Sequence, residues 1–371
     1  MTYQDLKKIT RKSIYMENEQ CFLPVILATM LANRLDTHPV WLMIIAGPSS
    51  GKTIFINALS QCDEGIMVSM LTPKTLISGA KNRDTVDGKE ASLMAKLDGK
   101  VMLIKDASTI TEMNPGNRSE VFSQLRTAFD GSLEKDSGLG RKSFDAKFGI
   151  IIAGTSALEK VRTFESELGE RFLNFRPVPE ENDNVWPFLE SIAGIKSKLH
   201  AELADAMHEY LSKCGTPDRI IIPSQIKQHA EFLVRLRAGV SRDSYKRHVN
   251  HPADDGLEAP FRVGEQLGAL YTCLLYILQN EHKAMSITER VALDSVPYTR
   301  MRFIQCLQKD ICTQAKIARA MKMSENAVRE LVENMELLDI TDITLTANSK
   351  KITLKTRYKQ LFNLCSRGYA T

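Results

Sequence analysis

The sequence predicts an α/β protein: a parallel sheet with helices on both faces, followed by a helical lid and a C-terminal winged helix-turn-helix. Three short apolar runs, at 40–46, 101–104 and 148–153, have the length of strands that are buried on both faces. Helical patterns such as 120–129 separate them, and strands that alternate with helices form a parallel sheet. After about residue 177 helical periodicity dominates, which predicts a second, helical region.

The first half of the chain holds the expected sheet. Residues 20–35 are apolar on most of one face and predict a helix, with Pro24 near its first turn, where proline is tolerated. The strand at 40–46 runs directly into a loop and an amphipathic helix at 53–60. This order of strand, loop and helix is typical of phosphate-binding sites.

The second half holds the lid and the winged helix. Helical periodicity covers 186–211, 223–238 and 263–279, and the stretch 248–260, with two prolines, predicts a loop. From residue 313 two helices and two strand-like runs follow in the order of a winged helix-turn-helix, at 314–321, 324–338, 343–346 and 351–355. We expect four parts: an N-terminal helical segment over 1–39, an α/β core over 40–180, a helical lid over 181–285 and a winged-helix domain over 286–371.

Composition limits the class of protein. A chain of 371 residues is long enough for two or three domains, and it has no apolar run of the ~20 residues that span a bilayer. The first residues lack the apolar core of a signal peptide, so we expect a cytoplasmic protein without membrane partners. The seven cysteines show no C-x-x-C spacing, which argues against a zinc site, and a net charge of +4 restricts nucleic-acid contacts to local patches.

The strongest motif is a phosphate-binding loop of the form [AG]-x4-G-K-[ST]. Its residues are Ala46, Gly47, Pro48, Ser49, Ser50, Gly51, Lys52 and Thr53. The glycine lets the backbone approach a phosphate, and the N–H groups at the helix N-terminus bind the anion. Lys52 reaches the β- and γ-phosphates and Thr53 holds Mg²⁺. The sequence therefore predicts ATP and Mg²⁺ as cofactors.

A carboxylate on the magnesium side of such a site is expected after a second buried strand. The run 101–104 leads to Asp106, which we predict as this ligand. Most ATPases of this kind place a glutamate next, to orient the attacking water, but this chain has Ala107 and Ser108. Hydrolysis is then slow, is dispensable to a nucleotide-dependent switch, or uses another carboxylate, with Glu64, Asp84, Asp87 and Glu112 as candidates of equal standing.

Two further segments carry a family resemblance. The strand at 148–153 ends in Gly154-Thr155-Ser156, and residues 168–173 read Leu-Gly-Glu-Arg-Phe-Leu. With the phosphate loop, they resemble AAA+ ATPases, in particular minichromosome-maintenance-like (MCM-like) helicases and their phage or mobile-element relatives, over about 40–178. The resemblance implies that Thr155 is the sensor-1 residue and that Arg171 is an arginine finger, worth ~10³–10⁵ in rate, acting on the neighbouring subunit's ATP. It also implies a homo-oligomer, with a hexameric ring expected.

The same resemblance suggests a lid arginine and a DNA-binding hairpin. Among Arg235, Arg237, Arg242 and Arg262, the last follows a proline at an expected helix start and is favoured as the sensor-2 residue that contacts nucleotide. Residues 132–145 predict a hairpin around a Gly-Leu-Gly turn. In MCM-like proteins a basic hairpin tip before sensor 1 grips DNA, and Arg141 and Lys142 would form it here.

The winged helix offers basic residues for DNA and acidic residues against it. Lys350 and Lys351 in the wing are the favoured phosphate contacts, and further basic or amide groups are Lys322, Asn326, Arg329, Lys355 and Arg357. Four carboxylates lie on the second helix: Glu325, Glu330, Glu333 and Glu336. A winged helix that contacts protein instead of DNA therefore stays open.

The favoured function is a DNA-associated, MCM-like AAA+ ATPase, a ring-forming helicase or translocase of a phage or mobile element. One alternative is a helicase loader or nucleotide-dependent switch that binds a replication or defence protein. The missing glutamate at Ala107 favours this alternative. The other is an ATP-regulated transcription regulator, which the acidic second helix disfavours.

Overall fold

The computed structural model describes residues 1–15, 21–48, 50–77, 92–137, 140–157, 171–177, 185–240, 257–346 and 349–363. The chain forms two compact units. The first comprises Met1–Ile222 with Gly268–Thr288, and the second comprises Pro223–Leu267 with Glu289–Thr371. The four-part division expected from the sequence stays a prediction.

A five-stranded parallel sheet forms the centre of the first unit, which confirms the predicted α/β class. The strand order is β2-β3-β6-β1-β7, and every neighbouring pair is parallel. The bounds are β1 (Trp41–Ile45), β2 (Gly65–Met67), β3 (Val101–Ile104), β6 (Gly149–Gly154) and β7 (Phe172–Phe175). Strands β1, β3 and β6 match the three apolar runs. The short edge strands β2 and β7 were not predicted.

Helices pack on the two faces of the sheet. Because side chains alternate along a strand, Trp41, Met43 and Ile45 of β1 face one side, where they share a buried cluster with α6 (Pro115–Phe129). The short helices α4 (Met94–Leu97) and α5 (Ser108–Thr111) contribute to the same cluster. Helices α2 (Phe22–Ala32) and α3 (Lys52–Leu59) contact the sheet strands as well, and α2 is buried along its whole length.

Three further helices of the first unit are α1 (Tyr3–Ser13), α9 (Val185–Ser191) and α10 (Lys196–Lys213). Thr2 and Asp5 form a capping box at the start of α1, which packs against α10. The continuous helical pattern expected over 186–211 is divided in two. The break follows from Gly194, whose φ of +79° lies outside the range of a right-handed helix.

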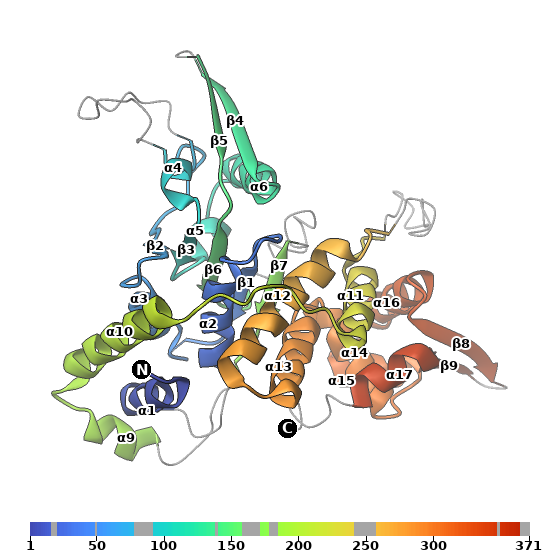
Figure 1. Cartoon of the computed structure of the whole chain (residues 1–371). Coiled ribbons are helices and arrows are strands. Elements are labelled where there is room, and N and C mark those ends of the chain that lie inside the picture. The colour runs from blue at the N-terminus through green and yellow to red at the C-terminus, as the bar shows by residue number, and fades with distance from the viewer. Residues whose placement is uncertain are drawn as a thin grey trace. The chain divides into compact units, whose positions relative to one another are not determined.

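A β-hairpin leaves the sheet after α6, as predicted. Strand β4 (Ser132–Ser137) pairs antiparallel with β5 (Gly140–Asp145), and the last rung joins Ser137 to Gly140. Figure 1 shows the two strands as a long ribbon that extends away from the five-stranded sheet. The two residues at its turn, 138 and 139, lie outside the described residues.

The second unit is helical except for one hairpin. Its elements include α11 (Ser224–Arg237), parts of α12 (Phe261–Leu278) and α13 (Glu281–Asp294), α14 (Tyr298–Gln308), α15 (Gln314–Met321), α16 (Glu325–Leu337), β8 (Thr341–Thr346), β9 (Ser349–Leu354) and α17 (Thr356–Asn363). Ser324 accepts a hydrogen bond from the backbone of Ala327 and so caps α16. From α15 to β9 the elements follow the predicted order. Across the described ranges every helix is too short or too polar to cross a bilayer.

Candidate functional site

The loop between β1 and α3 is the centre of the candidate site. The strand ends at Ile45 and the helix begins at Lys52, and Gly51 caps the helix with a φ of +78°, a conformation that favours glycine. A Cβ atom at Gly47 would meet open space, so the backbone there is accessible to a ligand. Ser49 lies outside the described residues.

The amine of Lys52 lies inside this loop. Its Nζ donates to the carbonyl oxygens of Ala46 at 2.9 Å and Gly47 at 2.5 Å and to Oγ of Ser50 at 3.0 Å. Burial lowers the pKa of Lys52, and the charge of Asp106 acts in the opposite direction. The ammonium is therefore held by the loop and coupled electrostatically to the chain that follows β3.

The sheet brings three predicted site segments to one edge. The N–H of Ala46 donates to Gly154 O at 3.1 Å, and the N–H of Ala107 donates to Ala153 O at 2.8 Å, so the residues after β1, β6 and β3 lie next to one another. Thr155, which follows β6, is exposed, as is Asp106. The carboxyl edge of a parallel sheet is the usual place for ligands in open α/β folds.

Two side chains near the lysine carry oxygen atoms that could bind a metal ion. Thr53 is exposed in the first turn of α3, and Oδ1 of Asp106 accepts a hydrogen bond from the N–H of Ser108 at 2.9 Å. Among the described residues, no group of three or more His, Cys, Asp or Glu side chains is placed to hold a metal. A hydroxyl and one carboxylate suit Mg²⁺, which keeps most of its ligands as water and phosphate oxygen.

The residue after Asp106 points away from this edge. Ala107 is fully buried and belongs to the apolar cluster between the sheet and α6. A longer polar side chain at this position would enter that cluster. The packing at this position therefore disfavours the glutamate that the motif leads one to expect.

The other candidate bases differ in their surroundings. Glu64 accepts a short hydrogen bond from Arg34, which also donates to Cys214 O at 2.6 Å and Leu211 O at 2.8 Å. This network joins the end of α2 to the end of α10, so Glu64 has a structural partner. Glu112 is exposed after α5. The two aspartates of the set, at 84 and 87, lie outside the described residues.

Arg171 is not brought to the loop by the fold of one chain. It precedes β7, whose first residue, Phe172, pairs with Trp41 at the amino end of β1. At this amino end of β1, on the opposite side from Lys52, Arg171 lies 3.6 Å from a carboxylate oxygen of Asp130. It also lies 5.6 Å from the centre of the Phe129 ring. Its side chain is largely buried. The predicted segment before it, 168–170, lies outside the described residues.

Arg262 belongs to the second unit. It lies in the first turn of α12, where its guanidinium is 3.1 Å from Glu258. The predicted contact of this residue with nucleotide stays a prediction.

The predicted DNA contacts are on the two hairpins. Arg141 and Lys142 belong to β5, where they are the register partners of Asp136 and Lys135, and their side chains are outside the description. Lys350 and Lys351 are exposed on β9.

The sequence did not reveal a cation cluster beside that second hairpin. Lys355 and Arg357 both donate short hydrogen bonds to the carboxylate of Asp339, and Arg235 lies 3.8 Å from it. Two of the basic groups expected near the wing are thus engaged within the chain. These residues are far apart in the sequence, and the packing of α11 and of the chain around β8 and β9 brings them together.

Comparisons with known proteins add no family to this picture: no protein-family model matches the chain, and no curated protein is significantly similar to it.

Proposed function

We propose that this chain is an ATPase of the AAA+ type that binds ATP and Mg²⁺ at the loop between β1 and α3. The observation that carries the proposal is the meeting, at one sheet edge, of Lys52, Asp106 and Thr155. In this reading the loop's N–H groups and Lys52 bind the phosphates. Thr53 and Asp106 hold the metal, which neutralises charge on the phosphates, and Thr155 orients the terminal group.

The proposed setting is an oligomer that acts on DNA in the cytoplasm. A ring, with a hexamer expected, would let Arg171 of one subunit act at the site of the next. The projecting β4–β5 hairpin with Arg141 and Lys142 supports DNA contact, as do Lys350 and Lys351 if the last elements form a winged helix. An MCM-like helicase or translocase of a phage or mobile element fits these features best.

A second candidate is a nucleotide-dependent switch or helicase loader that binds a partner protein and hydrolyses ATP slowly. The burial of Ala107 favours it, because the position cannot hold a water-orienting carboxylate without disrupting the apolar cluster. The two candidates differ in whether DNA accelerates turnover.

Steady-state ATP hydrolysis, measured with no DNA, with single-stranded DNA and with double-stranded DNA, tests the proposal. We expect Mg²⁺-dependent turnover that DNA stimulates and that Lys52→Ala abolishes. Replacing Arg141 and Lys142 together by Ala should weaken DNA binding and leave ATP affinity unchanged. Turnover that DNA leaves unchanged would favour the switch, and failure of the wild-type chain to bind ATP would refute both candidates.

A further inference from the structure

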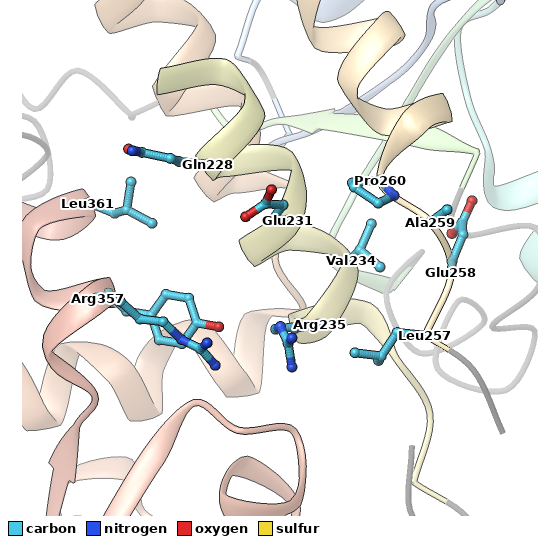
Figure 2. A pocket seen from close by; sticks show the side chains of 11 residues that line it. Gln228, Glu231, Val234, Arg235, Leu257, Glu258, Ala259, Pro260, Arg357 and Leu361 are labelled. Carbon is cyan, nitrogen blue, oxygen red and sulfur yellow. The ribbon is translucent and has the colours of Figure 1, made fainter. Parts of the chain in front are cut away.

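The second unit contains a cavity of about 420 Å³. Figure 2 shows it between one face of α11, the residues before α12 and one face of α17. Its walls are Gln228, Glu231, Val234 and Arg235 from α11, residues 257–260, and Arg357, Tyr358 and Leu361 from α17. This volume is in the range of sites that bind small ligands or a few peptide side chains.

The floor of the cavity is apolar. Val234, Tyr358 and Leu361 are each at least nine-tenths buried. The ring of Tyr358 packs on Phe232 with 5.0 Å between ring centres, and this contact fixes the floor against α11. An apolar side chain of a ligand would bury against these groups, at about 25 cal/mol per Å² removed from water.

Two guanidinium groups lie at one end of the cavity. Arg357 stacks over the ring of Tyr358 at 4.7 Å and donates to the main-chain oxygen of Asp339 at 3.0 Å as well as to its carboxylate. Arg235 approaches the same carboxylate from α11, at 3.8 Å. Each guanidinium has five N–H donors, so one shared carboxylate leaves donors for a second anion.

Two carboxylates also line the cavity. Glu231 is exposed one helical turn before Arg235, and within the described ranges its side chain makes no hydrogen bond or ion pair. Glu258 stands on the segment before α12 and is 3.1 Å from Arg262. A ligand with repeated negative charge, such as nucleic acid, would meet both carboxylates, whereas a ligand with one acidic and one basic group would find a partner for each.

We propose that this cavity binds a peptide segment of a partner protein that carries a basic, an apolar and an acidic residue in close succession. The acidic group pairs with Arg235 and Arg357, the basic group pairs with Glu231, and the apolar side chain packs against Val234, Tyr358 and Leu361. This site does not depend on ATP binding at the loop of the first unit. It gives the chain a protein-recognition function whether or not it hydrolyses ATP.

Selection from defined peptide libraries tests the inference. One library holds capped hexapeptides with one Lys, one Glu and apolar residues elsewhere, and a matched library has Gln in place of both charges. We expect the full chain to retain the charged library preferentially and to bind its enriched members at micromolar concentration by fluorescence anisotropy. Lys52→Ala should bind them equally, which separates this site from the nucleotide site.

A charge reversal distinguishes recognition from a structural role. Glu231 is exposed, so Glu231→Lys should fold normally, weaken the enriched peptides at least five-fold and improve binding of the same peptides with Glu in place of Lys. Glu202→Lys, the same charge change at an exposed position on α10, is the matched control and should alter neither affinity.

Four results would overturn the proposal. They are equal retention of the two libraries, unchanged preference in Glu231→Lys, displacement of the peptide by a thymidine oligonucleotide, and binding that appears only when residues 364–371 are deleted. The last result would assign the cavity to the chain's own C-terminal segment.

Discussion

Arg171 and Lys52 lie at opposite ends of strand β1. The arginine precedes β7, beside the amino end of β1, and the lysine begins α3, beyond the carboxyl end of β1. At about 3.3 Å per residue, the length of β1 separates these two positions by roughly 15 Å. Within one chain the two cations therefore do not share a phosphate. A site that uses both requires a second copy of the chain.

Mixing two inactive variants tests such a shared site. Arg171→Ala and Lys52→Ala should each lose at least 100-fold in ATP turnover, since arginine fingers contribute ~10³–10⁵ in rate. Equal amounts of the two, assembled at random, should recover about a quarter of the wild-type interfaces, because one subunit supplies the lysine and its neighbour the arginine. Hydrolysis at fixed total protein measures the recovery. An inactive mixture, or full activity in Arg171→Ala alone, would remove the arginine from the site.

The motif suggests that a glutamate at position 107 would accelerate hydrolysis, whereas the burial of Ala107 predicts that it would destabilise the fold. Restoring the expected residue with Ala107→Glu should not accelerate hydrolysis, because the carboxylate would enter the cluster between the sheet and α6. We expect a loss of about 3 kcal/mol in the free energy of unfolding at pH 8. Chemical denaturation measures it, with Lys105→Glu, at the exposed neighbouring position, as the control that should lose little.

The pH dependence of Ala107→Glu gives an independent readout. Burial raises the pKa of an introduced carboxyl in the folded state above its unfolded value, so the neutral form is the one the fold tolerates. The deficit should be largest above the folded pKa and should shrink as pH falls toward about 4, the ordinary value for glutamate. A deficit that is independent of pH would attribute the effect to side-chain volume alone. A rise in turnover would show that the carboxylate reaches the site edge.

The strands β1, β3 and β6 and the loop between β1 and α3 could be predicted because both depend on local pattern. Runs such as 101–104 are long enough and apolar enough to identify buried strands, and the described strand has the same bounds. The edge strands β2 and β7 could not be found this way, because β2 has only three residues and the polar Asn174 interrupts the apolar run of β7. The break at Gly194 was missed since one glycine within a helical pattern is often tolerated.

The interactions that distinguish residues with a structural partner from residues available to a ligand are between segments far apart in the sequence. Nothing in the sequence joins Arg34 to Glu64, or Asp339 to Arg235, since these pairs meet only after the helices and strands have packed. The orientation of Ala107 likewise depends on where β3 ends. Sequence could therefore propose Glu64, Lys355 and Arg357 for function, and only the fold shows that these three have structural partners.

The ion pair of Glu64 predicts a change in stability without a change in rate. Glu64→Gln should cost about 1–2 kcal/mol in the free energy of unfolding, because Arg34 would lose a charged partner while keeping its two carbonyl acceptors. ATP turnover should stay within two-fold of wild type at a temperature where both are folded. Glu112→Gln, at an exposed position, should leave stability unchanged. A large loss of turnover in folded Glu64→Gln would restore this residue as the base.

Cys62 provides a test of packing behind the loop helix. Burial, with the charges of Glu64 and Asp63, raises the pKa of its thiol to about 12. At pH 8 the reactive thiolate is then only ~10⁻⁴ of the total, against roughly a quarter for an ordinary thiol. Iodoacetamide labelling followed by mass spectrometry should leave Cys62 unmodified while the partly exposed Cys312 reacts. Rapid labelling of Cys62 in the native protein would contradict its burial.

The last hairpin separates cations that can contact DNA from cations that hold the fold. Lys350 and Lys351 are exposed, and replacing both by Ala should weaken DNA binding and reduce the slope of log affinity against log salt by about 2, with unchanged melting temperature. Lys355→Ala should lower the melting temperature and leave DNA binding unchanged, because that lysine is hydrogen-bonded to Asp339. Fluorescence anisotropy over a salt series and thermal melting measure the two effects. If the double variant binds DNA as wild type does, while its melting temperature stays the same, the hairpin contacts something other than DNA, and the case for a protein-binding C-terminal region becomes the stronger one.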